Sequence, residues 1–156
     1  MKTIILLIAF LPLSWACIAQ DTGAEPNFKD EAIGQVYKHY IHLKDVLVAS
    51  NFNDAQKAAI KLSSALEGHQ DMQKLANHIS KATSLEKQRT AFTKLSNEVI
   101  SLIKKSELTE GKVYVEYCPM ANANTGGFWL ANEQEIANPY FGSMMLKCGS
   151  VKEVIE

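Results

Sequence analysis

Residues 83–105 have the sequence TSLEKQRTAFTKLSNEVISLIKK, and this stretch decides the fold class. Its apolar side chains recur every three or four residues, which is the spacing of one face of an α-helix. They are Leu85, Phe92, Leu95, Val99, Leu102 and Ile103. Thr83 and Glu86 have the spacing of a capping box, and Lys104 and Lys105 suit the negative end of a helix dipole. The stretch therefore predicts the longest helix of the chain.

The same periodicity continues upstream, because the chain contains no proline from Lys29 to Ser106. A first helix is predicted from an apolar stripe of Ile33, Val36, Tyr37, Tyr40, Leu43 or Lys44, and Leu47. Asn53 and Gln56 form a capping-box pattern for a second helix, which Gly68 ends. A short third helix begins at Asp71. Short loops favour antiparallel neighbours, so residues 29–106 are predicted to form an up-and-down bundle of three or four helices.

The pattern changes at Gly111, where the C-terminal third of the chain begins. Val113, Val115 and Tyr117 alternate with their neighbours at period two, and residues 128–130 resemble a second short strand beyond a turn-rich segment. The two strands are predicted to pair as a small hairpin, followed by an apolar helical turn over residues 142–148. The expected architecture is one mostly α-helical domain over residues 29–156, with a β element that carries cysteine and methionine over residues 111–149.

This C-terminal element also holds two pairs of sulfur-containing residues. Met120 follows Cys118 by two residues, and Met145 precedes Cys148 by three. Thiolates and thioethers are soft donors that favour Cu(I) over harder cations, so these four residues are the candidate metal ligands. Two cysteines in an oxidising compartment also commonly form a disulfide. The sequence leaves three interpretations open: a Cu(I) site, a Cys118–Cys148 bridge, and two free buried thiols.

The beginning of the chain indicates export. Lys2 precedes an apolar run, and small residues follow it, in the order typical of a secretory signal over residues 1–19. Cleavage after Ala19 is the predicted outcome, whereas attachment of lipid at Cys17 is the alternative that makes the chain a lipoprotein. Residues 20–28 are polar and predict a flexible leader. No later segment is long and apolar enough to span a bilayer, so the mature chain is expected in the periplasm.

Composition and motifs argue against two other classes of function. The net charge of −1 and the lack of a basic stripe argue against nucleic acid as a partner. The sequence has no nucleophile elbow, no zinc-helix motif, no phosphate loop and no dinucleotide fingerprint, so we expect no enzyme. His78 flanks the stripe of the short third helix, which makes it a weaker candidate ligand.

Several motifs together resemble one known domain. They are residues 85–92, 113–121, 127–130, 135–136, 138–142 and 145–149. These resemble an exported bacterial domain of unknown function, which occurs alone or fused to periplasmic adaptor subunits of copper/silver-type heavy-metal efflux pumps. The resemblance covers about residues 35–156. Cys118-Pro119-Met120 is also similar to the Cys-Pro-Met-His core of a small metal-binding domain of such pumps, with Ala121 in place of the histidine.

The resemblance implies a metal-related role in the cell envelope, with efflux-pump components as partners. Together with the sulfur residues, it predicts a soft-metal binding or metal-efflux accessory module. The alternative prediction is an interaction domain without a metal, closed by a Cys118–Cys148 disulfide and docked on an envelope partner.

Overall fold

The computed structural model describes residues 24–156, so the predicted signal and Cys17 lie outside the described residues. The long helices are α1 (Glu31–Val48), α2 (Phe52–Ala65), α3 (Gln70–Lys81) and α4 (Leu85–Lys104). The strands are β1 (Asn27–Phe28), β2 (Leu108–Glu110), β3 (Val113–Cys118), β4 (Gly127–Ala131) and β5 (Ser150–Ile155). Two short elements complete the chain, α5 (Ala121–Asn124) and the 3₁₀ turn η1 (Gly142–Met144). The prediction of a mostly α-helical chain is confirmed.

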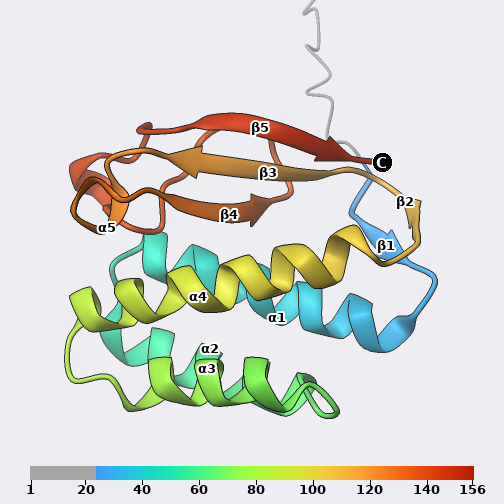
Figure 1. Cartoon of the computed structure of the whole chain (residues 1–156), viewed down its shortest axis with the longest axis horizontal. Coiled ribbons are helices and arrows are strands. Elements are labelled where there is room, and N and C mark those ends of the chain that lie inside the picture. Colours follow the sequence, from blue (N-terminus) through green and yellow to red (C-terminus); the bar gives the residue numbers. More distant parts are fainter. Residues whose placement is uncertain (1–23) are drawn as a thin grey trace, which may run out of the picture.

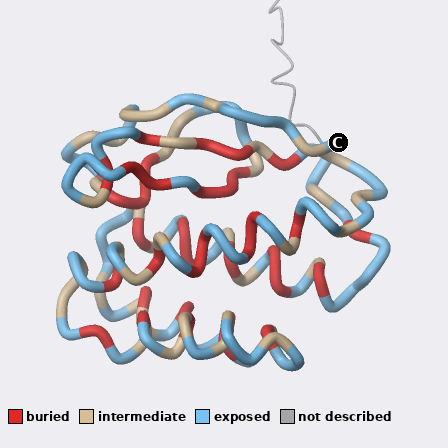
Figure 2. Tube along the Cα trace, in the orientation of Figure 1, coloured by how far each residue is buried: buried red, intermediate tan, exposed pale blue. Residues whose placement is uncertain are grey.

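The helices form two layers beneath a small sheet (Figure 1). Helices α1 and α4 lie next to the sheet, and α2 and α3 lie on the side away from it. Successive helices pack on one another, and both α1 and α4 also contact β4. The predicted stripes form the buried core along these contacts, as Figure 2 shows in red. Phe92, in the middle of α4, is fully buried, as the helical spacing predicts.

Three of the predicted helix starts are wrong by one or two residues. Helix α3 begins at Gln70 instead of Asp71. Helix α2 begins at Phe52, because the side chain of Asn51 accepts a hydrogen bond from the backbone N–H of Asp54 at 3.1 Å. Helix α4 begins at Leu85, because Ser84 caps the N–H of Lys87 at 3.2 Å. At α2 and α4 several neighbouring side chains are able to cap, so the pattern alone does not select one of them.

The main sheet is antiparallel, with the strand order β4-β3-β5. Strands β3 and β4 form the predicted hairpin, with Tyr117 opposite Phe128 and Cys118 opposite Gly127. Strand β5 pairs with the other edge of β3, placing Tyr117 opposite Ser150, and it was not predicted. Most of its side chains are exposed, so its sequence lacks the alternation of a half-buried strand.

A second correction concerns the predicted flexible leader over residues 20–28. Its last two residues form β1, which pairs with β2. Phe28 is buried, and its ring lies 5.3 Å from that of Tyr37 on α1. Burial of an aromatic side chain contributes about 2 kcal/mol, enough to hold a short segment against the helices.

Hydroxyl groups from the helices form hydrogen bonds with backbone groups at the outer edge of β4. The N–H of Leu130 donates to Tyr40 Oη at 3.1 Å, and Ser96 Oγ donates to the carbonyl oxygen of Phe128 at 2.8 Å. Tyr40 and Ser96 share a hydrogen bond of 2.6 Å, which completes the connection between these groups. Tyr140 donates a second hydrogen bond to the Phe128 carbonyl at 2.7 Å. The strand edge is thus paired with side chains instead of another strand.

No helix within residues 24–156 is long and apolar enough to cross a membrane.

Candidate functional site

The structure brings Cys118 and Cys148 together. Cys118 ends β3, and Cys148 lies two residues before β5, where Tyr117 and Ser150 are paired. Both side chains are free thiols, with Cys118 fully buried and Cys148 half-buried. The hydrogen bond between the two thiols raises the pKa of Cys148, and desolvation raises it further. The two thiols therefore lie close enough to interact directly.

Asn138 holds the segment that carries Cys148. Its side-chain amide donates to the carbonyl oxygen of Cys148 at 2.7 Å, and its Oδ1 accepts from the N–H of Tyr140 at 2.8 Å. Its own N–H donates to the carbonyl oxygen of Leu146 at 2.9 Å. Asn138 is fully buried, so each of these bonds is shielded from water. One side chain thus fixes both ends of the loop that leads to the thiol pair.

The backbone next to Cys148 approaches strands β3 and β4 closely at Gly149. It has a φ of +146°, and a Cβ atom there would lie 2.9 Å from Trp129 and 3.1 Å from the carbonyl oxygen of Tyr117. A side chain at this position would therefore push the loop away from β3 and β4.

Buried aromatic side chains lie on the core side of the thiol pair. Trp129 is fully buried and meets Tyr140 edge-on at 5.9 Å, and Tyr140 in turn contacts Phe92 of α4. Burial raises the pKa of Tyr140, and the charge of a Cys118 thiolate would raise it further. A wall of this kind keeps water from the buried thiol.

The methionines are placed differently from the cysteines. Met120 lies beyond the end of β3 and is exposed, whereas Met145 is half-buried. The predicted helical turn over residues 142–148 is short, because only Gly142–Met144 is a 3₁₀ turn. Cys148 donates its N–H to the carbonyl oxygen of Met145 at 3.0 Å in a separate turn. Among the four predicted ligands, Cys118 and Cys148 are the two whose side chains interact.

One buried charged residue near this pair, Glu116, was not predicted from the sequence. Glu116 alternates with Cys118 onto the same face of β3, opposite Trp129 of β4, and its side chain is fully buried. Burial raises the pKa of its carboxyl group to about 7, although Lys44 of α1 lowers it. Neither carboxyl oxygen meets the Trp129 indole N–H in a hydrogen bond of normal geometry. A strict alternation would put Val115 and Glu116 on opposite faces, but the register shifts between them and both side chains are buried.

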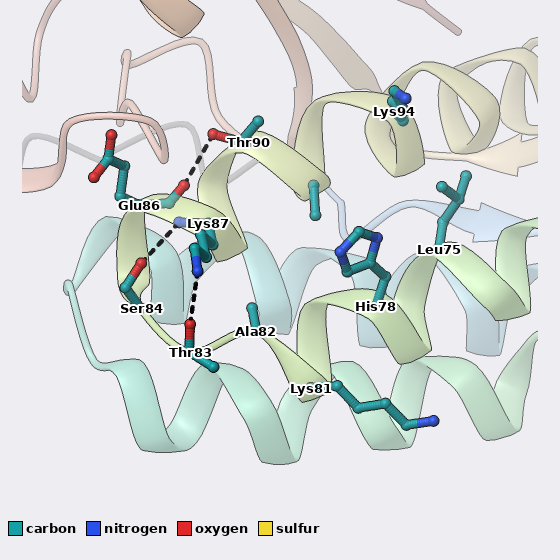
Figure 3. A pocket seen from close by; sticks show the side chains of 11 residues that line it. Leu75, His78, Lys81, Ala82, Thr83, Ser84, Glu86, Lys87, Thr90 and Lys94 are labelled. Carbon is teal, nitrogen blue, oxygen red and sulfur yellow. Dashed lines mark hydrogen bonds between the residues drawn. The ribbon is translucent and has the colours of Figure 1, made fainter.

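The histidines do not join the thiols. His78 is exposed on α3 and lines a hollow between α3 and α4, away from the sheet (Figures 1 and 3). Within residues 24–156, no group of three or more histidine, cysteine, aspartate or glutamate side chains is arranged to hold a metal ion. The donors available for a metal are therefore the two thiols and any methionine sulfur that moves toward them, a set that suits a soft ion of low coordination number.

Comparison with known proteins finds a domain of unknown function in the helical part. Searches against curated proteins and against solved structures give no match. The family model that matches is described as a protein of unknown function (DUF3347), and it covers residues 36–111. The matched region runs from α1 to the end of β2, so both cysteines lie beyond it. The chain is therefore similar to this family of unknown function over residues 36–111.

Proposed function

We propose that this chain is an exported soft-metal-binding module, an accessory to metal efflux in the cell envelope, with Cu(I) as its metal. The observation that carries the proposal is the contact between the thiols of Cys118 and Cys148. Cu(I) accepts two thiolate ligands in a low-coordinate site, and such a site permits transfer to a partner. Met120 and Met145 are the neutral ligands of the proposal, and efflux-pump components are the partners it implies.

The surroundings of the thiols support this proposal in two ways. Cys118 is enclosed on a rigid strand, whereas Cys148 is partly accessible on a loop fixed by Asn138. One ligand is thus preorganised, and the other offers a route for the ion. The buried aromatic wall of Trp129 and Tyr140 protects an oxidisable ion from water.

A titration of the reduced protein tests the proposal. Cu(I) held by a chelator of known affinity is offered to the wild type, Cys118→Ser and Cys148→Ser. We expect each serine variant to lower the affinity by orders of magnitude, because each loses a thiolate. Met72→Leu on α3, which removes a sulfur remote from the pair, serves as the control. A reduced wild type that takes no copper from a weak chelator rules out the metal site.

The same contact favours a second candidate, a disulfide-closed interaction domain. Oxidation of two facing thiols in an exported protein would close the loop from Cys118 to Cys148. In the chain-entropy model such a bridge stabilises the fold by about 3–4 kcal/mol. Intact mass and thiol labelling of protein purified from its own compartment distinguish the two. A disulfide removes two hydrogens and blocks labelling, whereas the metal-binding form labels at both cysteines after the metal is removed.

A further inference from the structure

A hollow between α3 and α4 is a second candidate binding site, and it is separate from the thiol pair. It has a volume of about 560 Å³, within the range of small-molecule sites. Its walls come from the last half of α3, the α3–α4 connection and the first turns of α4 (Figure 3). Leu75, Ala82 and Ala91 supply apolar surface, so the hollow suits a ligand with a hydrocarbon part.

Cationic side chains border this apolar surface. Lys81, Lys87 and Lys94 line the hollow together with His78, whose ring lies between the two helices. Glu86 is the one acidic residue of the lining, and its side chain points away from His78 in Figure 3. The hollow is therefore locally positive in a chain of net charge −1. This arrangement favours an anion.

The lysines of the hollow differ from most other lysines in having no carboxylate partner. Seven lysines elsewhere in residues 24–156 form ion pairs, from Lys29 near β1 to Lys147 before β5. Within that same part of the chain, Lys81, Lys87 and Lys94 form none. Lys87 donates to Thr83 Oγ1 at 3.0 Å; both residues line the hollow, and two protons of the Lys87 ammonium group stay available.

The hydroxyl groups add further donors. Ser84 Oγ accepts from the N–H of Lys87, and Thr83 Oγ1 accepts from the Lys87 ammonium. The hydroxyl hydrogens of both residues are therefore free to donate to a ligand. They stand at the positive end of the α4 dipole, which has the same sign as the lysines.

We propose that this hollow binds a small free carboxylate with a short hydrocarbon chain. Its carboxylate lies among His78, Lys87 and Lys94, and its chain covers Leu75, Ala82 and Ala91. This assignment does not depend on metal binding at the cysteines.

The test uses sodium octanoate as the probe and the full chain in reduced form, followed by ¹H–¹⁵N NMR. We expect saturable shifts confined to residues 75–94. Lys87→Gln and Lys94→Gln each weaken binding by about two- to fivefold, as loss of one exposed charge contact predicts. Lys61→Gln, at an exposed lysine of α2 outside the hollow, is the matched control and leaves the affinity unchanged. Shifts that grow linearly without saturation, or that spread over the whole chain, overturn the site.

Three further probes test the chemistry of the ligand. 1-Octanol has the same hydrocarbon chain without the charge, and equal binding of octanol overturns the role of the lysines. Inorganic phosphate has charge without a chain, and equal binding of phosphate overturns the role of the apolar surface. The third probe is a suspension of phosphatidylglycerol vesicles, mixed with the chain at the protein concentration used in the octanoate titration and then sedimented. We expect the chain to stay in the supernatant. Co-sedimentation that Lys87→Gln abolishes would show that the ligand is a membrane surface instead.

Discussion

The backbone N–H of Leu130 donates a hydrogen bond to the hydroxyl of Tyr40, although 90 residues separate them in sequence. Tyr40 lies in the middle of α1, and Leu130 is on the strand nearest the helices. The Tyr40 hydroxyl also bonds to Ser96 of α4, so one atom joins two helices and the sheet. The attachment of the sheet to the helices thus depends on a few buried hydroxyl groups.

Tyr40→Phe should lower the free energy of unfolding by about 1–3 kcal/mol, because it leaves the Leu130 N–H and the Ser96 hydroxyl without this partner in a dry site. Urea melts measure the change. Tyr114→Phe is the control, since Tyr114 is only half-buried on β3. Equal effects of the two substitutions would contradict the importance of the buried connection.

Phe92→Ala should cost about 3–5 kcal/mol, because Phe92 is fully buried between Tyr40 and Tyr140. Ile60→Ala on the exposed face of α2 is the comparison and should cost much less. Thermal or urea unfolding of both variants gives the result. A loss below 1 kcal/mol for Phe92→Ala is incompatible with this packing.

Arg89→Lys should destabilise the fold by about 1–3 kcal/mol, because lysine cannot reproduce three separated hydrogen bonds. The Arg89 guanidinium donates to the carbonyl oxygens of Pro139 and Leu47 and to Ser50 Oγ, at 2.8–2.9 Å. It therefore ties α4 to the end of α1 and to the loop before Gly142. Lys87→Gln, two residues away on the exposed side of α4, should leave stability within about 0.5 kcal/mol.

Glu116 should make stability depend on pH, in a direction that its burial determines. Its carboxyl group titrates at about 7 in the folded chain, above its ordinary value of 4.5. Between these values the folded state holds a proton that the unfolded state has lost. The contribution to stability is therefore complete below pH 4.5 and is lost as the pH rises through 7, by up to about 3 kcal/mol.

Urea melts of the wild type and Glu116→Gln at pH 5 and pH 8 test this dependence. The glutamine stays neutral, so the variant should lose much of the difference between the two pH values that the wild type shows. If the two proteins have parallel stability curves, Glu116 is ionised in the fold, and the stated direction is wrong.

The elements that were predicted correctly are those with a strong local signal. The stripe of α4 has a long helical period, and burial of Phe92 follows from it. Strand β5 was not predicted because most side chains of its sequence, Ser-Val-Lys-Glu-Val-Ile, are exposed, so the sequence lacks the alternation of a half-buried strand. Burial of Glu116 was not predicted because the register of β3 against β5 shifts between Val115 and Glu116, so two successive side chains are buried and the alternation is broken.

The candidate site was predictable only in its most general terms. The presence of two cysteines in the C-terminal third suggested that they meet, and the structure places them in contact. The groups that bring them together are less visible in the sequence. Asn138 and Gly149 act through a buried amide and a close approach to Trp129, which no local pattern signals.

The position of Cys148 next to the last strand has a kinetic consequence. Strand β5 is an edge strand of the main sheet, held by pairing with β3 and by the ion pair between Lys104 and Glu153. Detachment of β5 would carry Cys148 away from Cys118 and admit solvent to a side chain that is fully enclosed in the closed state. The rate at which a small alkylating reagent modifies Cys118 would then measure how often this strand opens, and any link between the two sulfur atoms would slow that opening.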